Sequence, residues 1–581
     1  MIKRLAKCIR EYRTYTILAP IAIILEVVME VLIPSLMAKL IDYGIEPGNM
    51  SYILKMGAVL IGCALVSMFF GAFAAWSSSR ASAGFAKNVR HDLFHKVQTF
   101  SFSNIDKFSP ASIVTRLTTD VTRVQMAFMM LIRMALRSPF MLIFSLLMSF
   151  TINVKLSLVF LICVPILAFG LCYVSLTTHP IFKKVFETYD KLNLIVQENL
   201  RGIRVVKSFV REDHEIGKFK GVSEEIYSGF SRAQRRMATI NPLMQFSMYL
   251  CTLLLSWFGA KLIITSGGSS LSTGDLTSII SYAGQILSSL MMVSMFLILM
   301  IMSRASAARI CEVLDENPDI QNPASPVTSV KDGSIEFENV DFSYGKKSEN
   351  LVLKQINLNI RSGQTIGILG GTGSSKSSLV QLIPRLYDAT SGAVRVGGVD
   401  VRDYDIRTLR EAVAMVLQKN ELFSGTIRDN VRWGNMDASD EDIVRVCRLA
   451  QANGFITEMP DGYDTMIEQG GTNVSGGQKQ RLCIARALLK KPKILILDDS
   501  TSAVDTRTDA LIQRAFAEEI PDTTKIIIAQ RVSSIQHADH IIVMDNGYIN
   551  GYGTHEELLE NNEIYREVYQ SQLKGMGDYD E

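Results

Sequence analysis

The chain has 581 residues, of which 48% are hydrophobic and 20% are charged, and its mean hydropathy is +0.19. That length exceeds one ordinary domain, and the hydropathy excludes an ordinary soluble protein. The formal net charge is only +2, so no basic surplus indicates a nucleic-acid partner. The eight cysteines are widely spaced and lie mostly in apolar context. They predict buried free thiols rather than a disulfide framework or a metal site.

Apolar runs long enough to cross a bilayer are confined to the first half of the chain. Six spans of about 20 residues are expected, at 16–37, 56–76, 134–151, 156–174, 244–264 and 279–302. Lysine and arginine crowd the segments after the second and fourth spans, whereas the opposite loops and the span ends beside them offer only Lys39, Lys55, Lys155 and Lys261. This bias predicts that both termini and the rest of the chain lie in the cytoplasm.

The two basic segments are too long for simple loops and too helical in composition for linkers. We expect helices that continue well beyond the bilayer, with a short crosswise turn near 104–110 and another near 200–208. Residues 311–334 are rich in Pro and Asn, as is typical of a linker between separately folding units. The fold class is therefore an α-helical membrane domain over 1–310 joined to an α/β domain over 335–581.

A phosphate-binding pattern opens the α/β domain. An apolar strand over 364–369 runs into a Gly-rich segment, and a helical pattern follows over 378–387. In such a P-loop the backbone N–H groups cradle phosphates, Lys376 reaches the outer ones and the Ser377 hydroxyl takes Mg²⁺. Ser375 stands where the motif has its second glycine. The candidate nucleotide-binding residues are Gly370, Gly371, Thr372, Gly373, Ser374, Ser375, Lys376, Ser377 and Ser378.

A second stretch, 473–505, carries the matching chemistry. Ser475, Gly476 and Gly477 open a helix with little side-chain bulk, so its free N–H groups can approach a phosphate closely. An apolar strand at 494–497 ends on two adjacent carboxylates, at the edge where α/β sheets place their ligands. The stretch therefore predicts a phosphate sensor beside a site for Mg²⁺ and water.

These motifs together resemble the ATP-binding cassette (ABC) family, in the family's order and spacing over 335–573. The resemblance implies a P-loop nucleotide domain with a helical subdomain, Tyr344 stacking on adenine, Gln418 as the Q-loop residue and Asp505 closing the D-loop. Mg²⁺ would be held by Ser377, Gln418 and Asp498. The family signature, which acts on the ATP of a partner chain, corresponds to Val474, Ser475, Gly476, Gly477 and Gln478. The segments near 104–110 and 200–208 resemble the coupling segments of ABC exporters.

Two positions depart from the family. The residue after the Walker B aspartate is usually glutamate and here is Asp499, whose carboxylate falls about an ångström short. The switch-loop histidine is replaced by Gln530, which cannot carry a proton or positive charge near the γ-phosphate. With Ser375, these changes predict a site that binds Mg-ATP and turns it over slowly or not at all.

The signature is nearly intact, so this chain would offer a competent signature to a neighbour and keep a poor site for itself. The pattern resembles the degenerate half of bacterial heterodimeric multidrug exporters, which implies a different ABC half-transporter as partner. It also implies a bacterial cytoplasmic membrane as location, and ATP and Mg²⁺ as cofactors. The expected function is ATP-driven efflux of drugs or of amphipathic, lipid-like compounds. The alternatives are a homodimeric lipid or peptide exporter and a regulatory or ATP-gated subunit.

Charged residues in the spans bear on the cargo. Glu26 and Glu30 lie one helical turn apart in the first span, where carboxylates are costly. The two glutamates predict either a cavity that favours cationic amphiphiles or a structural Glu–Arg pair between helices. Arg133 and Arg137 are expected either to contribute to the cavity or to extend toward the lipid headgroups. Met295 and its neighbouring methionines would line an adaptable surface or simply pack.

Overall fold

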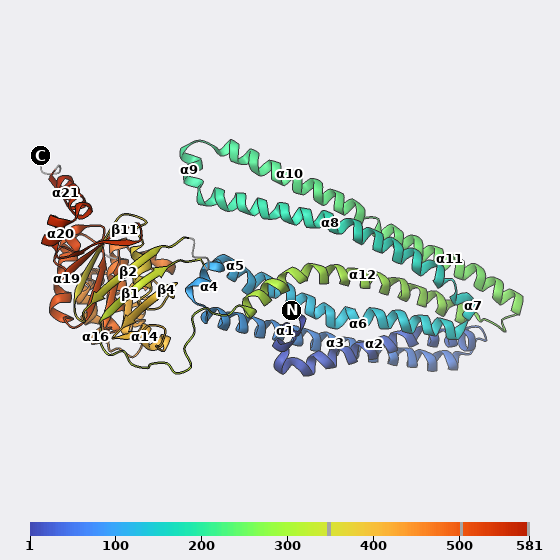
Figure 1. Ribbon diagram of the computed structural model, residues 1–581. Coiled ribbons are helices and arrows are strands. Elements are labelled where there is room, and N and C mark those ends of the chain that lie inside the picture. Colours follow the sequence, from blue (N-terminus) through green and yellow to red (C-terminus); the bar gives the residue numbers. More distant parts are fainter. Residues whose placement is uncertain (346–349, 500–503, 578–581) are drawn as a thin grey trace. The chain divides into compact units, whose positions relative to one another are not determined.

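The computed structural model describes residues 1–345, 350–499 and 504–577, without the side chains at 297, 298, 301, 302 and 574–577. The chain divides into two compact units (Figure 1). The first comprises Met1–Thr99 and Ser109–Glu316, and the second comprises Phe100–Phe108 and Asn317–Glu581. The short segment Phe100–Phe108 therefore belongs with the C-terminal unit, although both flanking segments belong to the first.

The first unit is entirely helical among its described residues. Its long helices are α2 (Arg13–Leu40), α3 (Met50–Gln98), α6 (Val121–Ile152), α8 (Phe160–Arg201), α10 (Glu212–Met237), α11 (Ile240–Ser266) and α12 (Thr273–Asp315). The short ones are α1 (Ile2–Ala6), α5 (Pro110–Thr115), α7 (Val154–Ser157) and α9 (Ile203–Ser208). Within the described ranges, six helical stretches are long and apolar enough to cross a membrane, which confirms the six predicted spans.

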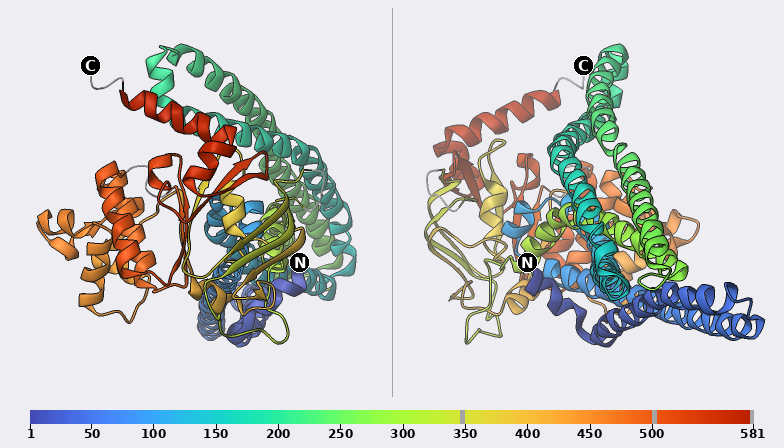
Figure 2. Two further views of the ribbon diagram at one scale, coloured as in Figure 1. Left: turned by 60° about the vertical axis from the view of Figure 1, so that its left-hand side comes forward. Right: turned by 90° about the vertical axis from the view of Figure 1, so that its right-hand side faces the viewer.

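Several helices run far beyond the apolar core of their span, as predicted. α8 and α10 lie side by side and are joined at their far ends by α9 (Figures 1 and 2). Short helices also occupy the two expected turns, since α4 (Phe102–Lys107) lies near 104–110 and α9 near 200–208. The prediction that the cysteines are buried is wrong for Cys172, which is exposed, and for Cys63, which is half-buried. Both lie on membrane helices, where an apolar side chain can face lipid.

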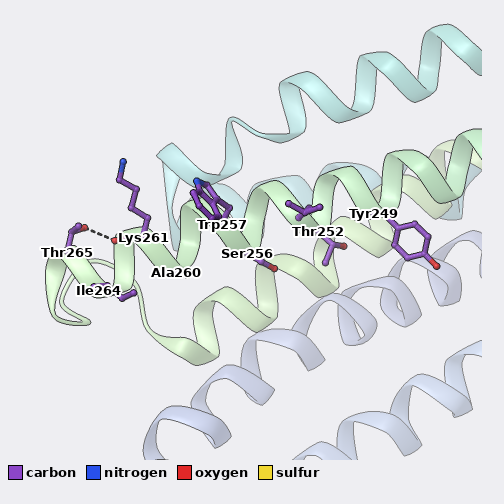
Figure 3. A pocket seen from close by; sticks show the side chains of 9 residues that line it. Tyr249, Thr252, Ser256, Trp257, Ala260, Lys261, Ile264 and Thr265 are labelled. Atoms are coloured by element: carbon purple, nitrogen blue, oxygen red, sulfur yellow. Dashed lines mark hydrogen bonds between the residues drawn. The ribbon is translucent and has the colours of Figure 1, made fainter.

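One face of α11 is uncovered within the unit. An open hollow on this single helix is lined by nine residues (Figure 3). They are Tyr249, Thr252, Leu253, Ser256, Trp257, Ala260, Lys261, Ile264 and Thr265. The Trp257 side chain is largely exposed. Apolar side chains on a membrane helix can be covered by lipid alone. The hollow therefore needs no bound molecule to explain it.

The second unit is built on a six-stranded sheet in the order β12-β11-β3-β10-β9-β6, in which only β12 is antiparallel. The strands are β3 (Thr365–Leu369), β6 (Val413–Val416), β9 (Ile494–Asp498), β10 (Thr524–Ile528), β11 (His540–Asp545) and β12 (Tyr548–Gly553). β9 and β10 are buried along their whole length, as is typical of central parallel strands, although Thr524 and Lys525 of β10 and Asp498 of β9 are polar.

A second, antiparallel sheet of order β2-β1-β4-β5 completes the strand framework with a small ribbon, β7 to β8. These strands are β1 (Ile335–Phe342), β2 (Leu353–Ile360), β4 (Ser391–Val396), β5 (Val399–Asp400), β7 (Gly425–Thr426) and β8 (Met466–Ile467). The helices are α4, α13 (Lys376–Gln381), α14 (Ile406–Ala412), α15 (Ile427–Arg432), α16 (Asp440–Leu449), α17 (Asn453–Glu458), α18 (Gly476–Leu489), α19 (Thr506–Glu519), α20 (His555–Asn561) and α21 (Glu563–Gly577). The combination is an α/β domain with a helical subdomain, as predicted.

The helix after the P-loop is shorter than predicted. The helical pattern suggested 378–387, but α13 ends at Gln381. Pro384 lacks an N–H group and disfavours helical backbone at the residue before it, and Arg385 takes a positive φ of 51°. The hydrophobic spacing beyond Gln381 therefore belongs to a buried turn rather than to a helix.

Candidate functional site

A cavity of about 560 Å³ lies at the carboxyl ends of the neighbouring strands β3, β10 and β9. This is the edge at which parallel α/β sheets hold their ligands, because consecutive strands open toward it. The predicted site residues that line the cavity are Gly370, Gly371, Thr372, Gly373, Ser375, Lys376, Ser377, Ser378, Gln418, Asp498, Asp499 and Gln530. The fold thus gathers segments more than 150 residues apart in the sequence around one space.

The P-loop precedes the N-terminal end of α13, and the side chain of Lys376 folds back onto the loop. Lys376 Nζ donates to the carbonyl oxygens of Gly370 and Gly371, both at 2.8 Å, and to Ser374 Oγ at 3.3 Å. Burial lowers the pKa of Lys376, although Asp498 and Asp499 oppose that shift. A Cβ added at Gly371 or Gly373 would meet no atom within 4 Å. The loop therefore has open space beside its backbone, as close approach of phosphate requires.

Ser375 has a strained backbone conformation. It takes φ 74° and ψ 21°, the left-handed region in which a residue with a Cβ costs on the order of 1–2 kcal/mol. The P-loop motif has glycine at this position, and the geometry supplies the reason. The departure noted in the sequence is thus a conformational cost as well as a change of side chain.

Ser375→Gly is expected to raise the free energy of unfolding by about 1 kcal/mol, because the folded backbone already suits glycine. Nucleotide affinity should stay within about twofold, because relief of a strain that the folded chain carries before nucleotide binds does not by itself change affinity. Thermal melting and titration with a fluorescent ATP analogue measure both effects. Thr372→Gly is the control, since Thr372 lies in the same loop without a positive φ and should lose stability instead. Equal responses of the two variants would contradict the strain argument.

Oxygen ligands converge at the start of α13. Ser377 Oγ donates to Asp498 Oδ1 at 3.0 Å, and Gln418 lines the same cavity. Burial and the neighbouring Asp499 raise the pKa of Asp498, so its charge is poorly compensated by the protein alone. A hydroxyl, an amide oxygen and a carboxylate are ligands that Mg²⁺ accepts alongside phosphate oxygens. The residues present therefore fit Mg-ATP.

The position of the catalytic carboxylate is occupied by a closed polar pair. Gln530 Nε2 donates to Asp499 Oδ2 at 2.8 Å, and the Gln418 side chain also hydrogen-bonds Asp499. Burial raises the pKa of Asp499, while these two amides lower it. Asp499 has φ 48°, a region where aspartate is more common than most residues. Its carboxylate is therefore held by two amides instead of being presented freely to a water.

The signature residues form a helix start at the protein surface. Ser475 caps α18, since Ser475 Oγ accepts from Gln478 N at 3.3 Å and Gln478 Oε1 accepts from Ser475 N at 2.9 Å. Ser475 and Gly476 are exposed. None of Val474, Ser475, Gly476, Gly477 and Gln478 lines the cavity among the residues described. The signature thus faces outward and is available to a molecule beyond its own P-loop.

Three further predicted residues, Ser374, Asp505 and Tyr344, do not line the cavity. Asp505 caps α19 and accepts from Thr508 N at 2.9 Å, while residues 502–503 of the D-loop lie outside the described ranges. Tyr344 is 51% exposed, and its hydroxyl lies 2.8 Å from Ser378 Oγ. The Tyr344 ring also lies edge-on to Tyr387, with centroids 5.1 Å apart. An exposed ring anchored to α13 remains free on one side to stack on a base.

Helix α4 packs directly on the nucleotide-binding unit. Tyr387 Oη donates to Asp106 Oδ2 at 2.7 Å, and the Phe102 ring meets the Tyr387 ring edge-on at 6.0 Å. Burial and the Asp106 carboxylate raise the pKa of Tyr387, so its hydroxyl stays a proton donor. Tyr387 thus contacts both α4 and the Tyr344 ring. The turn near 104–110 was predicted from the sequence, but the contact of Tyr387 with α4 was not.

The C-terminal helix also contributes to the site, which no motif indicated. Gln572 Nε2 donates to the carbonyl of Gln530 at 2.8 Å, and Gln572 Oε1 accepts from Val532 N at 2.9 Å. Val568 of the same helix lines the cavity. The amphipathic pattern of α21 could have placed it on the domain, but the sequence carries no signal that it holds the switch loop.

Three charged residues of the first unit, Glu26, Glu30 and Arg137, form a cluster near the middle of α2 and α6. Arg137 Nη1 donates to Glu26 Oε1 at 2.5 Å, and Arg137 Nη2 donates to Glu30 Oε1 and Oε2 at 2.7 and 2.8 Å. Arg133 is exposed and forms no ion pair within the described part of the chain. Glu30 and Arg137 line a cavity of about 500 Å³, whereas Met295 is exposed outside it.

Arg137→Met should destabilise the folded unit by about 3 kcal/mol or more, because it leaves two carboxylates together without a counter-charge. The drop appears as a lower melting temperature of the detergent-solubilised chain. Replacing all three residues, as Glu26→Gln, Glu30→Gln and Arg137→Met, should recover most of the loss. Failure of the triple variant to recover would show that Arg137 stabilises the unit by packing rather than by charge.

Comparisons with known proteins agree with this architecture. The model of the ABC transporter transmembrane region matches residues 16–291, and the ABC transporter model matches residues 353–502. In Bacillus subtilis, the "Uncharacterized ABC transporter ATP-binding protein YfiB" is 37% identical over 570 residues, 98% of each chain. YknU of the same organism, described in the same words, is 36% identical over 487 residues, covering 84% of this chain and 83% of its own.

The fold is shared with a solved structure described as a bacterial Atm1-family ABC exporter with ATP bound. The TM-score is 0.82 at 21% identity, covering 97% of this chain and 98% of the other. A helical unit with six candidate spans precedes an α/β unit with a P-loop, and both match their family models. The chain belongs to the ABC transporter family and is a multi-pass membrane protein with the exporter fold.

Proposed function

We propose that this chain is one half of a heterodimeric ABC exporter and keeps a nearly silent ATP site, while its signature serves the site of a different partner chain. The proposed cargo is a drug or an amphipathic, lipid-like compound. The proposed location is a bacterial cytoplasmic membrane, with both termini and the nucleotide-binding unit in the cytoplasm. The observation that carries the asymmetry is the hydrogen-bonded pair of Asp499 and Gln530 beside a P-loop that departs from its motif only at Ser375.

At its own site the chain binds ATP more readily than it activates water. Lys376 and the P-loop N–H groups hold the phosphates, and Ser377, Gln418 and Asp498 would hold Mg²⁺, which supplies charge neutralisation when bound. A general base must reach the proton that it removes and be free to accept it. Asp499 is one methylene shorter than glutamate and already accepts from two amides. Hydrolysis at this site should therefore be slow.

The partner's site receives a competent surface from this chain. The exposed N-terminal turn of α18 offers the Ser475 hydroxyl and free N–H groups of a 14-residue helix to a phosphate. Two copies of this chain would pair two competent signatures with two poor P-loop sites. A partner that carries glutamate and histidine at the positions of Asp499 and Gln530 would complete one fast site.

Tyr387 links the proposed nucleotide site to α4 within the second unit. It contacts Tyr344, the proposed adenine platform, on one side and Phe102 and Asp106 of α4 on the other. A change in the position of the Tyr344 ring on nucleotide binding would reach α4 through these packed rings. We infer that α4 is one of the coupling segments that carry cassette closure to the spans.

Co-expression of two differently tagged copies of this chain tests the pairing. The copies are expressed in the native host with its genome intact, so that a natural partner chain is also produced. Heterodimerisation predicts that purification through one tag retrieves a second, different ABC half-transporter in equal amount and little of the other tagged copy. Equal recovery of both tagged copies would refute it and favour a homodimer. Uphill dye transport by the purified complex in vesicles supports export, whereas ATP-dependent ion current without uphill transport would favour a gated pore.

A further inference from the structure

The cavity beside Glu30 and Arg137 lies where three helices meet in the first unit. Its walls come from α2, α6 and α12, and its volume of about 500 Å³ falls in the range of sites for drug-sized molecules. Glu26 and Glu30 lie near the middle of the 28-residue α2, and Arg137 lies near the middle of the 32-residue α6. Glu26 and Glu30 therefore lie well inside the first predicted span, 16–37, whereas Arg137 lies near the start of the third, 134–151.

The meeting of α2 and α12 is fixed by a proline. Pro34 has no N–H to offer to the carbonyl of Glu30 one turn earlier, and Gln285 Nε2 of α12 donates to that carbonyl at 3.3 Å. Tyr282 Oη donates to the carbonyl of Val31 at 2.7 Å in the same turn. Ser145 Oγ of α6 then donates to Gln285 Oε1 at 2.8 Å. The cavity wall is thus a built polar arrangement and not a chance gap.

The charges in this arrangement do not cancel. Two carboxylates share one guanidinium, which leaves one formal negative charge, and the Glu30 side chain is 27% exposed in the cavity. A purely structural pair needs one carboxylate for one arginine, so the second is unexplained by stability alone. An uncompensated charge inside a membrane span is expensive and marks functional positions.

A second observation points into the same space. Ser138 lines the cavity and is 1% exposed, yet its hydroxyl has no hydrogen-bond partner among the described residues. Buried polar groups are nearly always partnered, so an orphan hydroxyl beside a cavity indicates a ligand position. Met141, Met292 and Ile33 supply the apolar part of the wall. Methionine side chains adapt readily to apolar bodies of different shape.

We propose that this cavity binds an amphiphile with one positive charge, whose cationic group lies against Glu30 and whose apolar body lies against Met141 and Met292. The proposal rests on the exporter function proposed above and names its class of cargo. The cation supplies the missing positive charge, and a hydrogen-bonding group near it can satisfy Ser138. Anionic amphiphiles of the same shape are rejected by the same excess charge.

Three fluorescent probes with one apolar body test the charge rule on the purified full-length complex. They are trimethylammonium-diphenylhexatriene, uncharged diphenylhexatriene and diphenylhexatriene propionate, and binding is followed by fluorescence anisotropy. The cationic probe should bind about tenfold or more tightly than the anionic one. Glu30→Gln should weaken the cationic probe about tenfold and leave the uncharged one unchanged. Glu46→Gln, an exposed glutamate outside the cavity, should change none of them.

Ser288→Lys gives an independent reading if Glu30→Gln folds poorly. It adds a positive charge to the cavity without touching the Arg137 contacts, so preference should shift from the cationic toward the anionic probe. An unchanged charge preference in both variants would overturn the proposal. ATP-driven probe transport without any dependence on Glu30 would overturn it and leave the exporter function standing. Binding that depends on Glu30, without ATP-driven transport, would instead support the cavity and contradict the exporter function.

Discussion

Replacing Ser475 with alanine should lower the ATPase rate of the assembled transporter on the order of a hundredfold, whereas Asp499→Asn should leave the rate within about twofold. The Ser475 hydroxyl stands at the exposed start of α18, where a phosphate bound by a partner chain would lie. Losing one positioned donor to a transition state has effects of that size in other enzymes. Asp499 is already engaged by Gln530 and Gln418, so amidation removes little that is used.

Ser475 also caps its helix, and that role must be separated from catalysis. Loss of a cap costs about 1 kcal/mol of stability. Thr554 caps α20 through the same reciprocal arrangement with Glu557 and lies outside the cavity, so Thr554→Ala is a matched control. The control should lose similar stability and keep its ATPase rate. Equal losses of activity from Ser475→Ala and Asp499→Asn would contradict the asymmetry.

Converting the two substituted positions should awaken this chain's own site. In a Ser475→Ala background, which silences the partner's site, Asp499→Glu with Gln530→His should raise the remaining ATPase rate about tenfold or more. Glutamate extends the carboxylate by one methylene, and histidine removes the amide that now holds it at 2.8 Å. An imidazole can in addition carry positive charge toward the phosphates.

The single changes help to assign the gain. Asp499→Glu alone keeps Gln530 as a donor to the carboxylate, so a smaller rise is expected. Gln530→His alone frees a carboxylate that is still too short. Steady-state ATPase of the purified complexes measures all three variants. A combined variant no faster than its background would show that something other than these two side chains silences the site.

The elements that position the nucleotide were predictable because they repeat local patterns. Continuous apolar runs predicted β3 and β9, and the glycine-rich turn between β3 and α13 predicted the P-loop. Hydrophobic length likewise predicted six spans. Periodicity failed at α13, since the apolar spacing continues past Gln381 while Pro384 stops the helix.

The features of the site that could not be predicted from the sequence depend on contacts between distant segments. The hydrogen bond from Gln530 to Asp499 joins the ends of two strands, and Gln572 reaches the same loop from the last helix. Arg137 bridges both glutamates of α2 from another helix, a pairing that the sequence left as one of two alternatives. Backbone angles were not predicted either, because no pattern in the sequence indicates that Ser375 takes a positive φ.

The most direct measurement is the ATPase rate of this full-length chain purified without any companion, compared with that of its Asp499→Asn variant. If this chain's own site is nearly silent, the isolated chain binds ATP through its P-loop, hydrolyses it at a rate close to background, and does not differ from the variant. Rapid hydrolysis by the isolated chain that Asp499→Asn abolishes would contradict a nearly silent site.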